Sequence, residues 1–91
     1  MLVKASEAKQ LIEKMTTDQL IQSKREVERQ TKTEQDNLDW AIRTPKSEVL
    51  HGTYRQWEDI RRNEQRIRES IANGKALLEM IDGEIARRRA A

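Results

Sequence analysis

The chain has no cysteine and no phenylalanine, and it has a single histidine and a single proline. Without cysteine there is neither a disulfide framework nor a thiolate nucleophile. Only three side chains are aromatic, so the bulky aromatic core of an ordinary globular fold is also missing. These shortages argue against a compact three-layer fold and favour an elongated helical one, which needs only a narrow apolar seam.

Sequence motifs of familiar catalytic chemistry are missing too. There is no H-E-x-x-H pattern, no glycine-rich phosphate loop and no G-x-S-x-G elbow. Carboxylates are plentiful, but on charged helices they mostly form solvated ion pairs, and no spacing singles out a metal-binding set. We therefore expect no enzymatic activity, no cofactor and no bound metal.

Long hydrophobic runs are the third shortage. No stretch is apolar enough to span a bilayer, and the first residues lack the apolar core of a signal peptide. The missing cysteine agrees with a reducing compartment. We expect a cytoplasmic protein that does not associate with membranes.

Charged residues and helix formers make up most of what is present. Charged residues are 37% of the 91 and hydrophobic residues 35%, and Glu, Lys, Arg, Gln, Ala and Leu dominate. A chain of this length forms one domain, residues 1–91, with a thin core. We predict an all-α fold, with a short N-terminal helix followed by a long antiparallel helical hairpin of coiled-coil type. Such hairpins assemble as oligomers into helical bundles.

Two polar segments set the expected helix boundaries. Thr16 and Gln19 have the spacing of a capping box, and Pro45 cannot continue a helix. The expected helices are residues 5–15, 18–43 and 47–89, with a turn at 44–47. The turn dipeptide Asn73-Gly74 lies inside the third helix, but the apolar period passes through it without a skip, which favours a continuous helix over a break.

The third predicted helix carries a heptad pattern with mostly apolar a and d positions. The a positions are Leu50, Trp57, Glu64, Ile71, Leu78 and Ile85, and the d positions are Thr53, Ile60, Ile67, Gly74, Ile81 and Arg88. Folding about Pro45 brings this seam against the second helix, with Thr31 near Ile60 and Glu34 near Trp57. Lys24 then lies opposite Glu64 as a counter-charge, unless Glu64 turns to solvent.

This register leaves the distal apolar part of the third helix beyond the reach of the second. The residues concerned, which we assign to self-association, are Leu77, Leu78, Met80, Ile81 and Ile85. The first helix can cover them with its own apolar stripe, or a second copy of the chain can. Because so polar a two-helix seam offers little net stability, we expect a homo-oligomer, with a dimer as the simplest form.

Cationic side chains line one face of the third predicted helix, beside Tyr54. They are Arg61, Arg62, Arg68 and Lys75. Arginine makes bidentate phosphate contacts and tyrosine stacks on bases, so one hypothesis is an oligomeric binder of nucleic acid or of a phosphate-bearing nucleotide. The alternative is that these cations pair with acids of the second helix, such as Glu26, Glu28 and Asp36, or with acids of a second copy of the chain.

All three aromatic side chains lie close to the predicted turn. Trp57 falls on the seam, whereas other residues fall beside it and are our candidates for partner binding: Trp40, Ile42, Arg43, His51, Tyr54 and Arg55. Tryptophan, tyrosine and arginine are the residues that dominate interface hot spots. The alternative is a small core that closes the end of the hairpin.

The leading hypothesis for function is therefore a small non-catalytic protein-binding module. It would be an intracellular adaptor or inhibitor that occludes or bridges its partner. A phage- or mobile-element-encoded antagonist of a host protein complex is one instance. A purely structural assembly component is a third possibility, besides the phosphate-binding one.

Overall fold

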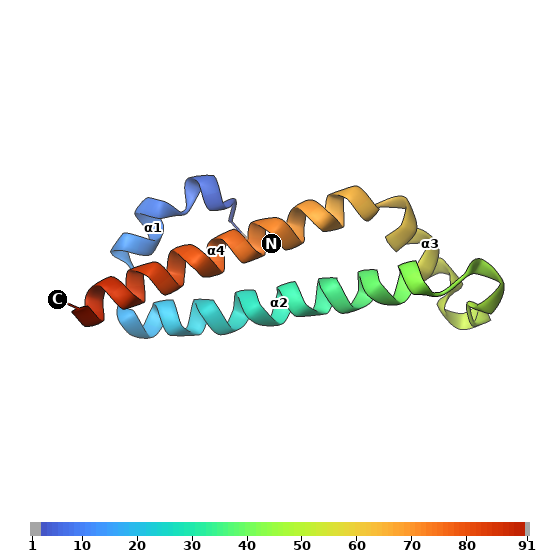
Figure 1. Cartoon of the computed structure of the whole chain (residues 1–91), viewed down its shortest axis with the longest axis horizontal. Helices are drawn as coiled ribbons and strands as arrows, with labels where there is room; N and C mark the ends of the chain where they lie inside the picture. The colour runs from blue at the N-terminus through green and yellow to red at the C-terminus, as the bar shows by residue number, and fades with distance from the viewer. Residues whose placement is uncertain (1–2, 91) are drawn as a thin grey trace.

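The computed structural model describes residues 3–90, which are mostly helical and include no strand. The elements in chain order are η1 (Ala5–Glu7), α1 (Lys9–Lys14), α2 (Thr17–Arg43), η2 (Lys46–Glu48), η3 (His51–Thr53), α3 (Tyr54–Arg62) and α4 (Glu64–Ala90). The molecule is a rod of 56 × 19 × 17 Å. Two 27-residue helices, α2 and α4, lie side by side along it (Figure 1). The all-α prediction and the long helix pair are confirmed.

Helix α2 begins where its capping residues predict. The Thr16 hydroxyl accepts from the Gln19 backbone N–H at 3.1 Å, and the Gln19 side chain accepts from the Thr16 N–H at 2.9 Å. These two bonds satisfy backbone donors that the first turn leaves unpaired. The helix ends at Arg43, since Thr44 and Pro45 are extended.

The connection after α2 is longer than the predicted turn at 44–47. It consists of η2 and η3, joined by Val49 and Leu50 in extended conformation, so that the next α-helix begins at Tyr54. Asn63 then separates α3 from α4, with its side-chain amide donating to the Asp59 carbonyl at 2.8 Å. The predicted single helix over 47–89 is therefore divided into two 3-10 turns and two α-helices.

Helix α4 passes through Asn73-Gly74 without a break, and both residues have structural roles. The Asn73 side chain accepts from the Ala5 N–H at 2.7 Å and donates to the Val3 carbonyl at 3.0 Å, which attaches the N-terminal segment to α4. Gly74 lies directly against Thr31 of α2, and a Cβ at Gly74 would overlap the Thr31 hydroxyl oxygen. Glycine here permits a close approach of the two helices.

The contacts between α2 and α4 differ from the predicted register. Thr31 meets Gly74, where Ile60 was expected, and the Ser70 hydroxyl donates to Glu34 at 2.9 Å. Lys24 pairs with Asp82 at 2.8 Å. At Thr31 the offset is two heptads along α4, because the connection takes up chain that was expected to pair with α2. Helix α3 packs against the end of α2 through Ile60 and Trp57.

Two apolar clusters lie on either side of the Thr31–Gly74 contact. One joins α1, the start of α2 and the end of α4, and its buried members are Ala8, Ile12, Leu20, Val27, Leu77, Ile81 and Ile85. The other lies beside α3 and is built from Leu38, Ala41, Ile60 and Ile71, with Trp40, Trp57 and Ile67 packed against it. We call the end of the rod that holds α1 the closed end.

The distal apolar residues of α4 are thus covered within the chain. Leu77, Ile81 and Ile85 are buried under α1 and α2, and Leu78 and Met80 are half-buried against the same cluster. The shifted register extends α2 over this part of α4, so the bare surface from which self-association was predicted is mostly filled.

Candidate functional site

The connection between α2 and α3 lies at the end of the rod opposite α1 (Figure 1). This connection and the adjoining ends of the two helices carry exposed apolar and cationic residues. We define the tip surface as Ile42, Arg43, Lys46, Leu50, His51 and Arg55, all of them exposed. Leu50 is 75% exposed and Ile42 is 42% exposed. In residues 3–90 the other large hydrophobic residues that are exposed are Leu11, in α1 at the closed end, and Val3, whose carbonyl is bound by Asn73 next to the Thr31–Gly74 contact.

Leu50 does not occupy the seam position that the sequence predicts. It was assigned to an a position of the seam, but it lies in the connection, extended, immediately before η3. Its carbonyl accepts from the Thr53 hydroxyl at 3.0 Å and from the Thr53 N–H at 2.9 Å. These bonds hold the backbone in a turn that directs the chain into α3. Because this segment is not helical, the heptad pattern does not extend back to Leu50.

Trp57 holds the tip surface to the end of α2. Its indole N–H donates to the carbonyls of Ala41 and Thr44, both at 3.0 Å. These carbonyls belong to the last turn and the C-cap of α2, so the indole satisfies acceptors that a helix end leaves unpaired. Trp57 is therefore part of the scaffold, as the alternative of a small closing core predicts.

The remaining aromatic residues are half-buried. The ring centroid of Tyr54 lies 5.9 Å from that of Trp57, and Trp40 packs against the cluster that contains Ala41. Lys46 lies 5.9 Å above the Tyr54 ring, within the range of a cation–π contact. Trp40 and Tyr54 thus support the surface more than they form it.

Of the six predicted partner-binding residues, the structure brings four to the tip surface: Ile42, Arg43, His51 and Arg55. Leu50 and Lys46 were missed. Proline and glycine within residues 45–52 were the available signal, since they disfavour a helix there and so leave an apolar residue without a seam to join.

Three of the cationic residues predicted to bind phosphate, Arg61, Arg62 and Arg68, form ion pairs with carboxylates of α3 and α4. Arg62 binds Glu58 at 2.6 Å, while Arg68 and Arg61 approach Glu64 at 2.9 and 4.0 Å. Ion pairing was expected, but with Glu26, Glu28 and Asp36 of α2. Glu26 instead binds Arg29, and Glu28 approaches Lys24. Lys75 lines a shallow hollow beside Gln35 and Arg68.

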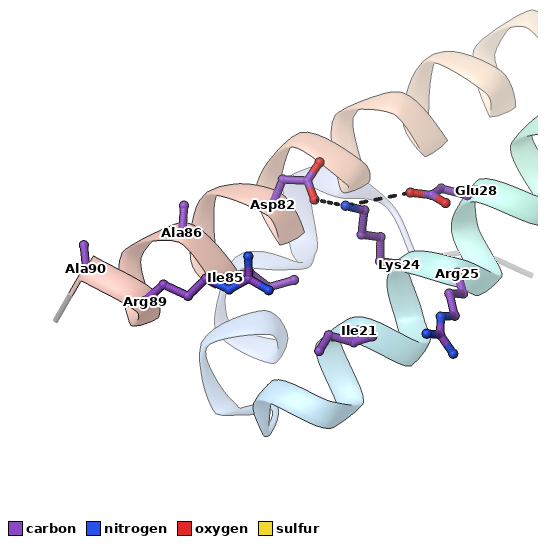
Figure 2. A pocket seen from close by; sticks show the side chains of 9 residues that line it. All are labelled: Ile21, Lys24, Arg25, Glu28, Asp82, Ile85, Ala86, Arg89 and Ala90. Atoms are coloured by element: carbon purple, nitrogen blue, oxygen red, sulfur yellow. Dashed lines mark ion pairs between the residues drawn. The ribbon is translucent and has the colours of Figure 1, made fainter.

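Glu64 was expected to lie opposite Lys24, but it forms ion pairs with Arg61 and Arg68 instead. Lys24 instead lies in an open hollow of about 780 Å³ between the start of α2 and the end of α4 (Figure 2). There it binds Asp82, whose hydrogen bond and charge raise the pKa of Lys24. Arg25 and Arg89 line the same hollow, over a floor that includes Ile85. It is a mixed-charge surface, with carboxylates beside its cations.

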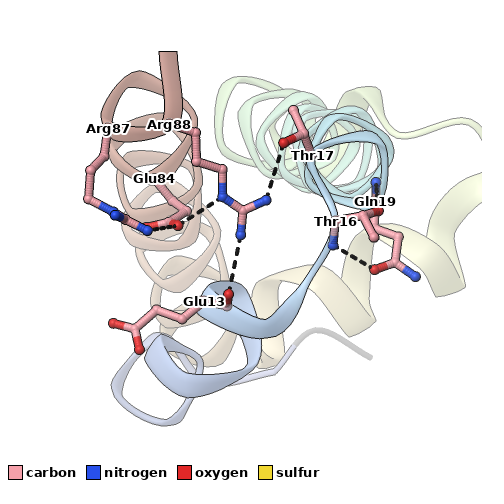
Figure 3. A network of polar contacts seen from close by, with 7 residues as sticks. All are labelled: Glu13, Thr16, Thr17, Gln19, Glu84, Arg87 and Arg88. Atoms are coloured by element: carbon pink, nitrogen blue, oxygen red, sulfur yellow. Dashed lines mark hydrogen bonds and ion pairs between the residues drawn. The ribbon is translucent and has the colours of Figure 1, made fainter. Parts of the chain in front are cut away.

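A polar network fixes the closed end (Figure 3). The buried Glu84 accepts hydrogen bonds from Arg87 and Arg88. These bonds lower the pKa of Glu84 to about 2, and the larger contribution comes from Arg87. Arg88 also donates to the Thr17 hydroxyl at 3.3 Å and to the Glu13 carbonyl at 3.2 Å. One guanidinium thus joins α1, α2 and α4, and its role is structural.

Other kinds of site have little support in the part of the chain that the structure describes. There, no three His, Asp or Glu side chains gather where they could hold a metal ion. Nor does any helix between residues 3 and 90 combine the length and the apolar character needed to cross a membrane. No family model, curated protein or solved structure matches the chain significantly.

Proposed function

We propose that this protein is a small non-catalytic protein-binding module that docks its partner on the tip surface. The observation that supports this most strongly is the exposure of Leu50, an aliphatic side chain held in solvent by an ordered connection. Ile42 lies on the same surface, whereas most other large apolar side chains of the rod are buried or half-buried. Exposed apolar residues that gather at one place mark interaction sites.

The scaffold under the tip surface favours binding by a preformed site. Trp57 fixes the last turn of α2, and Thr53 fixes the backbone at Leu50. A surface that is ordered before binding loses less conformational entropy when the partner arrives. Burial of one leucine side chain stabilises a complex by about 1.5–3 kcal/mol, so Leu50 is expected to be the main anchor.

The shape of the molecule fits an adaptor or an inhibitor in the cytoplasm. A rod of 56 Å that binds by one end can fill a partner's cleft and block it, or hold the partner at a distance from something bound elsewhere. A phage- or mobile-element-encoded antagonist of a host protein complex would act in the first way. A homodimer remains part of the proposal, with the half-buried Leu78 and Met80 as the contacts a second copy would make.

The chain offers a matched pair of leucines for the test. Leu50 lies at the tip and Leu11 at the closed end, and both are more than half exposed. The partner is first captured from the native host and purified, and its affinity is then measured by calorimetry for the wild type, Leu50→Ser and Leu11→Ser. We expect Leu50→Ser to bind roughly 10- to 100-fold more weakly and Leu11→Ser to bind like the wild type. Equal binding by both variants would refute docking at the tip.

A further inference from the structure

We propose that the tip surface recognises an acidic protein segment, one that presents an apolar side chain flanked by carboxylates. This inference rests on the proposed docking function and adds the chemistry of the partner. The tip surface combines aliphatic side chains with cations that the chain itself does not neutralise. A partner with an apolar side chain and carboxylates can bury these aliphatic side chains and pair with these cations at the same time.

Charge is distributed unevenly along the chain. Residues 42–55 contain three cationic residues, Arg43, Lys46 and Arg55, and one carboxylate, Glu48. The rest of the chain has fifteen cationic and fifteen anionic residues. The net charge of +2 therefore lies in the segment that contains Leu50.

Two of the carboxylates just outside this segment have partners elsewhere. Glu58, one turn into α3, binds Arg62 at 2.6 Å. Asp39, one turn before Arg43, accepts from the Gln35 side chain at 2.9 Å. Within the described residues no ion pair involves any of the three tip cations. At the closed end, by contrast, Arg87 and Arg88 both bind Glu84.

The cations lie close in the chain to the aliphatic anchors and come from three elements. Arg43 follows Ile42 at the end of α2, Lys46 begins η2, and Arg55 lies in the first turn of α3, with Leu50 between the last two in the chain. Carboxylates on a partner would gain charge-assisted hydrogen bonds at the rim while an apolar side chain is buried against Leu50.

Two other occupants fit this surface less well. A second copy bound tip to tip would bring two sets of the same cations together, and like charges repel. Nucleic acid needs aromatic faces on which bases stack, but Tyr54 and Trp57 are half-buried and have Lys46 and Arg61 over their rings, each at 5.9 Å. Aliphatic anchors suit a protein better than a base.

The test uses a displayed library of random 12-residue peptides, selected in parallel on the intact wild-type protein and on Leu50→Ser. Circular dichroism first checks that both are equally helical, which we expect because Leu50 is exposed. Peptides enriched on the wild type alone are expected to contain Asp or Glu beside a large apolar residue. Their affinity is expected to fall as salt rises.

One selected peptide is then synthesised and its affinity is measured for charge variants. Arg43→Gln, Lys46→Gln and Arg55→Gln are each expected to bind roughly two- to fivefold more weakly. Lys32→Gln is the matched control, because Lys32 is exposed in the middle of α2, and it is expected to bind like the wild type.

The possible outcomes separate the two proposals. If no peptide depends on Leu50, docking at the tip itself is wrong. If Leu50-dependent peptides are neutral or basic, or bind equally well at all salt concentrations, docking stands and the acidic partner is wrong. Tighter Leu50-dependent binding to single-stranded DNA or to phosphatidylglycerol vesicles would overturn a protein partner. Leu50-dependent self-association, measured by sedimentation, would make the partner a second copy.

Discussion

Two arginines of the closed end form ion pairs within the chain, whereas the arginines of the tip form none within residues 3–90. At the closed end Arg87 and Arg88 share the buried Glu84, and Arg88 also joins α1 to α2 through Glu13 and Thr17. At the tip no ion pair in residues 3–90 engages the nearby arginines. The same side chain thus stabilises the fold where its partners are built in, and is available for binding where they are missing.

Apolar residues are buried at the closed end and partly exposed at the tip. The cluster at the closed end draws on three helices, with Ile81 3% exposed at its centre. At the tip, Ile42 and Leu50 remain in solvent over a scaffold held by Trp57. The contrast implies that substitutions at the closed end change stability, and substitutions at the tip change binding.

The largest expected effect is the loss of a core side chain at the closed end. Ile81→Ala removes buried methyl groups and leaves a cavity, which destabilises by about 2–5 kcal/mol. Ile42→Ala, the matched change at the tip, is expected to alter the free energy of unfolding by less than about 0.5 kcal/mol. Urea denaturation followed by circular dichroism measures both. Similar losses in the two variants would remove the distinction between the ends.

The next effect concerns the contact between the two clusters. Gly74→Ala places a methyl group on the Thr31 hydroxyl and is expected to destabilise by about 1–3 kcal/mol. Thr31→Ala removes that hydroxyl, which has no hydrogen-bond partner among the described residues, so the double variant is expected to recover most of the loss. A double-mutant cycle in urea measures the coupling. Strictly additive effects would contradict the observed register.

A smaller effect is expected at the scaffold of the tip. Trp57→Phe keeps an aromatic ring but removes the N–H that binds the carbonyls of Ala41 and Thr44. A net loss of about 1 kcal/mol follows from the missing hydrogen bonds. Amide hydrogen exchange locates the change, with faster exchange expected at the end of α2 and unchanged exchange at its start. Uniformly faster exchange would mean that Trp57 supports the whole fold.

Acid provides a test specific to the closed end. Hydrogen bonds from Arg87 and Arg88, of which the Arg87 bonds contribute more, lower the pKa of Glu84 from 4.5 to about 2. Since the folded pKa is the lower one, Glu84 contributes stability above pH 4.5, and this contribution is lost as the pH falls towards 2. We expect the wild-type Tm to fall more steeply than that of Glu84→Gln over this range. Parallel Tm curves would contradict the role of Glu84.

The smallest expected effect on stability is at the proposed anchor. Leu50→Ser is expected to change the Tm by no more than about 2–4 °C, because the side chain is 75% exposed and makes few contacts to lose. A marked loss of stability in differential scanning calorimetry would show that Leu50 is structural, which would weaken its assignment to binding.

Local signals in the sequence predicted the bounds of α2 well. The capping box at Thr16 and Gln19 is present, and α2 ends just before Pro45. Heptad phase also identified buried positions of α4, including Ile71 and Ile81. These features depend on residues close together in the chain, whose effects can be read without knowledge of the fold.

The register between the helices could not be predicted in that way. A shift of two heptads returns the same residues to the seam, so the pattern alone does not distinguish Ile60 from Gly74 as the neighbour of Thr31. Close packing at Gly74 and the bonds from Trp57 favour the observed offset. Both depend on three-dimensional contacts, and so does the length of the connection that leaves Leu50 in solvent.

Site-specific photo-crosslinking in the native host shows directly whether a partner docks at the tip surface. A photoreactive amino acid is placed at position 50 in one variant and at position 11 in another, which puts the probe at the exposed leucine of each end. Docking at the tip surface predicts a discrete crosslinked protein from position 50 and none from position 11. The same crosslinked protein at position 11 alone would show that the closed end binds the partner and that the tip does not.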